Sequence, residues 1–376
     1  MVGGSAGFQS NRSDLDSAIS LNNHVKLTIP VYTGCMYGIV TSKDETVFAT
    51  VGVNSAMSDN HSVTVWRSDR KPLAPLCSFS THKTFVHSMV FLESCPLLLS
   101  CSDKLVICDY EQRVILSTVE SPRGPFTCMT SSSVSVTGKG VNGMLGWQQI
   151  FCGTRTNEIV CYDIRQKFYD ARLCAVFPLT PDTHQVGHPG DNTSHIPMLC
   201  AVTTLADKYI CAAWTNGVVD VLSQRVGTPL LHWQAHTMAV VKLQFLSEKR
   251  LLTACKDGSV CVWELRGTEK PVMVVKFTGL SALLNGHTLC VTECGTDLTV
   301  MAIGGDVLLS NSDMDLREYS HMETGGVQSY VMKADQVCDG ITGTALNKLR
   351  LGVMAVCPMR RIALCGSEDG KLYVVQ

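Results

Sequence analysis

Charged residues are scarce in this sequence, and neither sign is in excess. They make up 17% of the 376 residues, and 31 Lys and Arg against 33 Asp and Glu leave a formal net charge of -2. Binding to phosphate backbones or to anionic membranes draws on a surplus of positive charge. We therefore expect protein partners, and we do not expect nucleic acid as the main direct ligand.

Long apolar runs and a disulfide framework are also missing. No run approaches the roughly 18 to 20 apolar residues that a membrane helix needs, so no membrane association is expected. The 18 cysteines fall singly inside apolar runs such as Val260-Cys261-Val262, whereas a disulfide scaffold is short and loop-rich. Free cysteine packs as a small hydrophobe, and the first residues lack an apolar signal core. These features predict a reducing compartment, the cytoplasm or the nucleus.

Motifs for catalysis, cofactors and metals are weak. Gly3-Gly4-Ser5-Ala6-Gly7 matches the nucleophile-elbow string but lacks the flanking strand and helix that this motif needs. One predicted loop gathers possible metal ligands, namely Asp182, His184, His188, Asp191 and His195. Pro181 and Pro189 argue against the helix that would place these side chains at ligand spacing. We expect no enzyme, no cofactor and no metal site.

What the sequence does have is apolar content and an internal repeat. Apolar residues make up 45% of the chain, enough for a large core. The clearest repeat unit, 235–266, contains three short apolar runs separated by turns. Its first run alternates Val240, Lys242 and Gln244 with the residues between them, which is the period of a strand. Asp257-Gly258 between the other two runs indicates a hairpin.

These residues resemble a WD40 repeat. His236 stands where that family has its Gly-His histidine, Asp257 is the turn aspartate, and Trp263-Glu264 stands for Trp-Asp. The resemblance implies a hydrogen-bond chain from histidine through serine and aspartate to tryptophan. Cys255 occupies the serine position, so we expect a weakened chain.

Six further copies align on this unit. The positions equivalent to the tryptophan are 66, 108, 162, 222, 263, 301 and 375, and Trp66, Asp103, Asp109, Asp163 and Asp369 stand at repeat positions of these copies. Their uneven spacing predicts insertions near 137–147, 178–197 and 313–350. The resemblance implies an all-β fold with a single β-propeller of about seven four-stranded blades. Whether an eighth blade lies within 302–350 stays open.

The two ends of the chain suggest how the ring closes. The last copy ends one strand short of a four-stranded blade, and 24–31 (HVKLTIPV) alternates like a strand. We expect this segment to supply the missing outer strand, with Pro30 tolerated at an edge. The propeller would span 21–376, and 1–20 would form a flexible tail.

Two short segments resemble the Trp-Asp-x-Arg box of cullin-4 ligase substrate receptors. They are Tyr162-Asp163-Ile164-Arg165 and Trp263-Glu264-Leu265-Arg266. In those receptors the Asp and Arg of the box engage the adaptor. The resemblance marks Asp163, Arg165, Glu264 and Arg266 as possible interface residues and a substrate receptor as one alternative function.

A second resemblance covers 126–245. A degenerate third blade around Gly153, an insertion ending at Ile196-Pro197-Met198, and a fourth blade with Asn216-Gly217 are similar to the Gβ-like WD-repeat protein of the ASTRA group. That resemblance implies a co-chaperone-type assembly acting on PI3K-like kinases.

The expected function is that of a non-enzymatic scaffold within a multiprotein complex. Partner contacts should concentrate in the insertions, where Tyr319 and Tyr330 are possible interface residues. A propeller hydrolase with a site at the central channel, using His184, His188 and Asp191, is a further alternative. Recognition of methylated or phosphorylated peptides is also left open.

Overall fold

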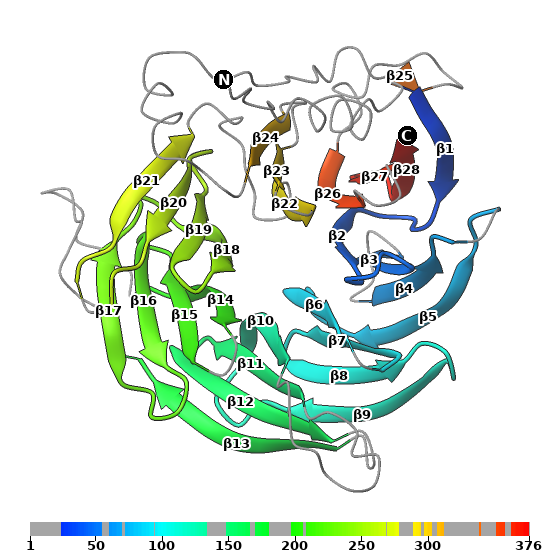
Figure 1. Ribbon diagram of the computed structural model, residues 1–376. Coiled ribbons are helices and arrows are strands. Elements are labelled where there is room, and N and C mark those ends of the chain that lie inside the picture. The colour runs from blue at the N-terminus through cyan, green and yellow to red at the C-terminus, as the bar shows by residue number, and fades with distance from the viewer. Residues whose placement is uncertain are drawn as a thin grey trace, which may run out of the picture.

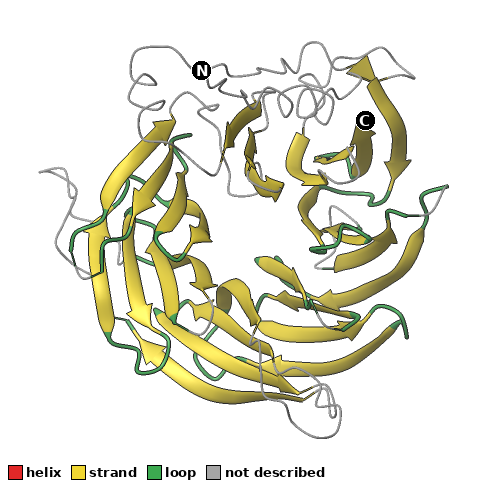
Figure 2. Cartoon of the chain, viewed as in Figure 1, coloured by secondary structure: helices red, strands yellow, loops and turns green. Residues whose placement is uncertain are grey.

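The structure is a computed structural model of the full chain. It describes residues 24–54, 60–69, 72–93, 95–133, 148–165, 170–179, 197–205, 208–267, 269–277, 289–294, 297–302, 307–311, 338–339, 351–357 and 362–375. These residues form strands and turns, coloured along the chain in Figure 1 and by type in Figure 2. None of them belongs to a helix long and apolar enough to span a membrane.

The strands form seven antiparallel sheets, which we number along the chain. Sheet 1 contains β2 (Met36–Thr41), β3 (Val47–Val53), β4 (His61–Arg67) and β5 (Pro75–His82); sheet 2 contains β6 (Ser88–Phe91), β7 (Leu97–Cys101), β8 (Lys104–Asp109) and β9 (Val114–Glu120). Sheet 3 contains β10 (Phe126–Ser133), β11 (Gln148–Thr154), β12 (Glu158–Arg165) and β13 (Asp170–Pro178); sheet 4 contains β14 (Leu199–Leu205), β15 (Tyr209–Trp214), β16 (Val218–Ser223) and β17 (Pro229–Gln234). Sheet 5 contains β18 (Val240–Ser247), β19 (Arg250–Cys255), β20 (Val260–Glu264) and β21 (Val272–Phe277); sheet 6 contains β22 (Leu289–Cys294), β23 (Asp297–Ala302) and β24 (Val307–Asn311).

Sheet 7 joins the two ends of the chain. It contains β26 (Leu351–Cys357), β27 (Ile362–Ser367) and β28 (Lys371–Val375), and its outer strand is β1 (His24–Pro30). β1 pairs antiparallel with β28, with Ile29 opposite Leu372 and Pro30 opposite Lys371. The two-residue β25 (Cys338–Asp339) adds a short parallel pairing on the far side of β1. The prediction of an N-terminal strand that completes the last blade is confirmed.

The sheets are arranged around a ring, with the first strand of each toward the centre (Figure 1). First strands contact one another from sheet 1 to sheet 5, and β26 contacts both β22 of sheet 6 and β2 of sheet 1. Middle strands such as β7 are buried along their whole length, whereas the outer β9 is largely exposed. This gradient arises because neighbouring sheets cover both faces of each middle strand.

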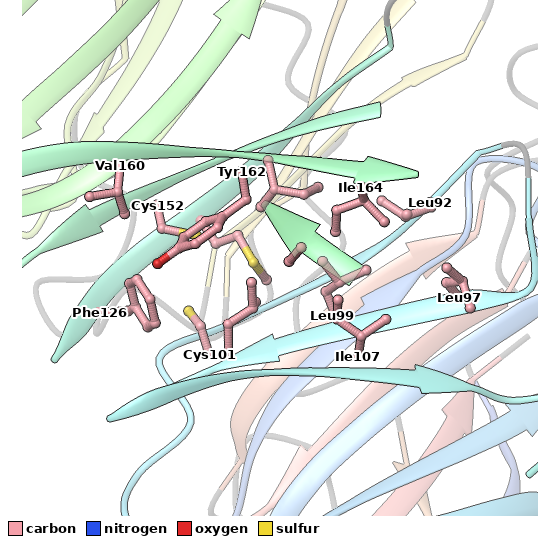
Figure 3. Packing of buried hydrophobic residues seen from close by; sticks show 14 residues of the cluster. Leu92, Leu97, Leu99, Cys101, Ile107, Phe126, Cys152, Val160, Tyr162 and Ile164 are labelled. Atoms are coloured by element: carbon pink, nitrogen blue, oxygen red, sulfur yellow. The ribbon is translucent and has the colours of Figure 1, made fainter. Parts of the chain in front are cut away.

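The core lies between neighbouring sheets, as between sheets 2 and 3 (Figure 3). There Leu99 and Cys101 of β7 face Phe126, Cys152 and Tyr162 of sheet 3. Cysteine packs here as a small apolar side chain. The cysteines whose side chains are described are all free.

The repeat alignment agrees with the strand assignment in six of the seven copies. Six of the seven tryptophan-equivalent positions fall in the third strand of their sheets, namely β4, β8, β12, β16, β20 and β28. Position 301 instead falls in β23, the second described strand of sheet 6, so the sixth copy does not align with the others. The predicted insertion 137–147 lies outside the described residues, between β10 and β11. Of 178–197 only the ends are described, between sheets 3 and 4, and of 313–350 only Cys338–Asp339. The described residues form no sheet beyond the seven.

Candidate functional site

A buried hydrogen-bond chain ties the start of sheet 5 to its third strand. Trp263 Nε1 donates to Thr253 Oγ1 at 2.9 Å, and Thr253 Oγ1 lies 2.7 Å from His236 Nε2. On the other side of the imidazole, His236 Nδ1 lies 3.1 Å from Ser259 Oγ, and this hydroxyl donates to Asp257 Oδ1 at 2.6 Å. Because the Ser259 hydroxyl donates to Asp257, it accepts from Nδ1–H of the neutral His236 ring, and Nε2 accepts from the Thr253 hydroxyl.

The expectation that Cys255 weakens this chain is wrong. The hydroxyl comes from Ser259, on the other side of the turn, and Thr253 makes the link to the tryptophan. The Cys255 thiol lies 3.5 Å from the carbonyl oxygen of Met238 and also hydrogen-bonds Asp257, at the end of the hydrogen-bond chain. The chain is therefore complete with a cysteine in the serine position.

Sheet 2 repeats this arrangement around His82. Its Nδ1 lies 2.7 Å from Ser102 Oγ and its Nε2 lies 2.7 Å from Ser100 Oγ. Ser102 in turn donates to Asp103 Oδ1 at 2.6 Å. Burial lowers the pKa of His82 and of His236 from 6.5 to about 4. Both imidazoles are therefore neutral at pH 7.

Sheet 1 uses a tyrosine in place of the histidine. The Tyr32 hydroxyl lies 2.9 Å from Thr50 Oγ1, and Trp66 Nε1 donates to the same oxygen at 3.0 Å. Gly52 makes room for the tyrosine, since a Cβ there would lie 2.4 Å from the Tyr32 ring. Tyr32 belongs to the segment between β1 and β2, so this contact lies where the ring closes. A hydroxyl on the second strand is the common feature that sequence analysis missed: Thr50, Ser100 and Thr253.

Two of the remaining repeat aspartates, Asp109 and Asp369, lie at hairpin turns. Asp109 Oδ1 accepts the backbone N–H groups of Glu111 and Gln112, at 2.9 and 2.8 Å. Asp369 accepts a hydrogen bond from Ser367 in the turn between β27 and β28. Both stabilise hairpin turns. Asp163 is buried in β12.

His236, Cys255 and Asp257 lie close enough together to suggest a metal site, with one ligand atom of each within 4.8 Å of the others. However, both ring nitrogens of His236 are engaged with hydroxyls, and Asp257 accepts from Ser259. Burial also raises the pKa of the Cys255 thiol, which disfavours the thiolate that a metal binds. These three side chains fit a structural hydrogen-bond chain better than a metal site.

One face of the ring carries exposed apolar side chains. In each of sheets 1 to 5 the four strands are antiparallel, so the residues that lead into the first strand lie on the same face as the turn between the second and third strands. We call this the loop face; its described loops are 31–35, 83–87, 121–125, 197–198 and 235–239. Phe85, Met198 and Met238 lie in three of these loops and are 38%, 40% and 46% exposed.

Phe85 is held in place by an aromatic cluster. Its ring stacks on Tyr37 with centroids 4.0 Å apart and lies edge-on to His61. The Tyr37 hydroxyl lies 2.8 Å from His61 Nδ1 and accepts the backbone N–H of Val86 at 3.1 Å. The exposed ring therefore sits on a fixed support.

The two Trp-Asp-x-Arg-like boxes lie on different sheets. Asp163 and Arg165 belong to β12 of sheet 3. Glu264 ends β20, the third strand of sheet 5, and Arg266 follows it, so sheet 4 lies between the two boxes. Glu264 and Arg266 pair with each other at 2.7 Å. The structure does not bring the two boxes together.

Several predicted site residues lie outside the described part of the chain. These are the possible interface residues Tyr319 and Tyr330 and the proposed channel or metal residues Asp182, His184, His188, Asp191 and His195.

Comparison with known proteins points to one family. The model of the WD40 repeat (WD domain, G-beta repeat) matches 73–108 and 227–264. These are the two segments that contain the hydrogen-bond chains of His82 and His236.

Two proteins of Dictyostelium discoideum are similar in sequence. The probable inactive serine/threonine-protein kinase lvsG is 21% identical over 321 residues, covering 85% of this chain and 14% of that protein. The WD repeat-containing protein 91 homolog is 32% identical over 65 residues, covering 17% of this chain and 8% of that protein. The chain thus spans only a small part of the length of either relative.

A solved structure supports the fold. The β-propeller domain of Cps50 (Swd1) from Myceliophteria thermophila superimposes with a TM-score of 0.63 at 13% identity, covering 93% of this chain and 98% of that one. This likeness agrees with the sheet topology, and the chain is a β-propeller that contains WD40 repeats at 73–108 and 227–264.

Proposed function

We propose that this propeller is a non-enzymatic scaffold that binds other proteins at its loop face, as a subunit of a multiprotein complex. The observation that carries the proposal is the group of exposed apolar side chains there: Phe85, Met198 and Met238. Aromatic and methionine side chains are enriched where proteins meet, and such residues contribute most when they enter a pocket on the partner.

Two of the loops that carry these side chains are held in place by buried histidines. Phe85 follows His82, which is fixed between Ser100 and Ser102. Met238 follows His236, which is fixed between Thr253 and Ser259. A surface ordered before binding avoids much of the entropy loss that would otherwise weaken an interface.

The arrangement of polar groups supports a non-enzymatic role. In a serine-hydrolase triad the histidine lies between the serine and the carboxylate. Here Ser102 lies between His82 and Asp103, and its side chain is fully buried. The serine hydroxyl is therefore neither activated by the histidine nor open to a substrate.

Narrower assignments also belong to this proposal. A co-chaperone-type assembly on PI3K-like kinases and a cullin-4 substrate receptor both stay predictions from sequence resemblance. The two Trp-Asp-x-Arg-like boxes lie apart, on sheets 3 and 5, and this separation supports neither assignment. A cytoplasmic or nuclear location is proposed on the basis of the free, apolar-packed cysteines.

The test is affinity purification followed by mass spectrometry. A triple variant, Phe85→Ser, Met198→Ser and Met238→Ser, should lose the protein partners of the wild type while keeping its melting temperature. A matched control, Val272→Ser with Met273→Ser, removes exposed apolar side chains from the outer strand β21 and should keep those partners. Equal recovery by all three proteins, or loss only in the control, would contradict the proposal.

A further inference from the structure

Two cysteine sulfurs meet across the hairpin of β12 and β13. Cys174 Sγ lies 3.2 Å from Cys161 Sγ and 3.2 Å from the carbonyl oxygen of Cys161. The contact arises from an irregularity in the ladder: Cys161 pairs with Ala175, the next pair is Tyr162 with Leu173, and Cys174 is left as the extra residue. Such a bulge redirects a side chain that regular pairing would have turned elsewhere.

The distance suits a covalent link between the two sulfurs. A disulfide has a sulfur–sulfur bond of about 2.05 Å, so an approach of roughly 1 Å converts this contact into a bond. The two residues lie on neighbouring, directly paired strands of one sheet.

The two thiols differ in access and in acidity. Cys174 is exposed, whereas Cys161 is 2% exposed and packs in the core between sheets 3 and 4. Contact with Cys161 lowers the pKa of the Cys174 thiol. The same contact, together with burial, raises the pKa of Cys161. Because Cys174 is exposed and Cys161 is buried, Cys174 is the thiol that a dissolved disulfide reaches first, and Cys161 is the thiol that follows it.

Other cysteines lack this combination. Among those whose side chains are described, Cys174 is the one that is exposed. Cys128 is buried, and burial raises the pKa of its thiol to about 11. Cys200 is largely covered, and its sulfur faces the carbonyl oxygens of Ala213 and Val240.

We propose that Cys161 and Cys174 form a redox-active dithiol that a small disulfide, such as oxidised glutathione, converts into an intramolecular disulfide. The Cys174 thiolate attacks one sulfur of oxidised glutathione and expels one glutathione thiolate, leaving a mixed disulfide. Cys161 then releases its proton to solvent, attacks the Cys174 sulfur and expels the second glutathione. The two cysteines lose two electrons and two protons, and one oxidised glutathione becomes two reduced glutathiones.

The disulfide would join Cys174, the exposed bulge residue of β13, to Cys161 in the core between sheets 3 and 4. Cys161 shares its core cluster with Phe151 of sheet 3 and with Leu199 and Trp214 of sheet 4. Oxidation would therefore act on the packing between these sheets. In a reducing compartment such a disulfide forms only under oxidation and is reversible.

The test exposes the purified full chain to graded ratios of oxidised to reduced glutathione, followed by acid quenching, alkylation of free thiols, trypsin digestion and mass spectrometry. Cys161 and Cys174 fall in different tryptic peptides, while Cys174 and Cys200 share one. In the variant Cys200→Ser that peptide holds Cys174 alone, so a cross-link to it can be assigned to Cys174. The same variant is the matched control, because it removes one largely covered thiol.

We expect a Cys161–Cys174 cross-link, with the loss of two hydrogen atoms, at ratios that leave Cys128 and Cys200 reduced. It should persist in Cys200→Ser and be absent in Cys174→Ser, where Cys161 should stay reduced. A second variant, Cys161→Ala, should retain glutathione on Cys174. Two results would overturn the proposal: a lasting glutathione adduct on Cys174 of the wild type, or no change at either cysteine when other thiols are already modified.

Discussion

Thr253 Oγ1 lies 2.7 Å from His236 Nε2, and this contact joins the loop before sheet 5 to the tryptophan of its third strand. One hydroxyl thus satisfies two buried nitrogen atoms, because Trp263 Nε1 donates to the same oxygen. A buried donor or acceptor left without a partner costs about 1 to 3 kcal/mol.

Thr253→Val should therefore destabilise the protein by about 2 to 3 kcal/mol, since it keeps the shape of the side chain and removes the hydroxyl. Urea unfolding followed by tryptophan fluorescence measures the loss. The matched control is Cys255→Ser, which should change the free energy of unfolding by less than about 0.5 kcal/mol, because a serine hydroxyl can keep the contacts of the thiol with Met238 and Asp257. A larger loss of stability in Cys255→Ser than in Thr253→Val would show that position 255, and not Thr253, supplies the central link of the hydrogen-bond chain.

Acidification should weaken the fold through the two buried histidines. In the unfolded chain a histidine has a pKa near 6.5, whereas burial lowers that of His82 and of His236 to about 4. Because the unfolded state takes up the proton first, this contribution to stability is complete above pH 6.5 and is lost as the pH falls toward 4. Each histidine accounts for about 3 kcal/mol across that window.

Unfolding free energies between pH 7.5 and 4 measure this loss. His236→Asn should lower stability at pH 7.5 and reduce the slope below pH 6.5, because one histidine with a lowered pKa is gone while His82 and His87, whose pKa burial also lowers, remain. An unchanged slope in that variant would show that other groups cause the acid sensitivity.

The turn of sheet 4 depends on a glycine. Gly217 has φ of 85°, and a Cβ there would lie 2.0 Å from the carbonyl oxygen of His236. Gly217→Ala should cost about 2 to 4 kcal/mol, from backbone strain and displacement of the loop before sheet 5. Gly267 is the matched control, with φ of 62° and open space around it. Gly267→Ala should lower the free energy of unfolding by about 1 kcal/mol. Equal losses in the two variants would show that the contact of the new Cβ with the His236 carbonyl does not destabilise the protein.

Strand β1 should be essential to the closed ring. Deleting 1–30 removes its pairing with β28 and uncovers part of the core to which Ile29 contributes. We expect a loss of about 3 kcal/mol or more, with aggregation through the exposed edge of β28. Deleting 1–20 alone should leave the melting temperature unchanged. If both deletions unfold at the wild-type temperature, β1 does not stabilise the ring.

The strand order could be predicted because each copy combines a turn residue with an alternating apolar run, as in Asp257-Gly258 followed by Val260–Glu264. The hydrogen-bond chain could not be predicted fully. Ser259 acts from beyond the turn, and Tyr32 replaces a histidine, so a fixed template places the hydroxyl at the wrong residue. The contact of Cys161 with Cys174 depends on a bulge, which a period of two does not reveal.

The central claim, that partners bind the loop face, is tested most directly by site-specific photo-cross-linking in cells. Benzoylphenylalanine would replace Phe85, Met238 or, as the outer-strand control, Met273, one at a time. The account predicts covalent adducts with a protein partner from positions 85 and 238 and none from 273. Adducts from position 273 alone would contradict it.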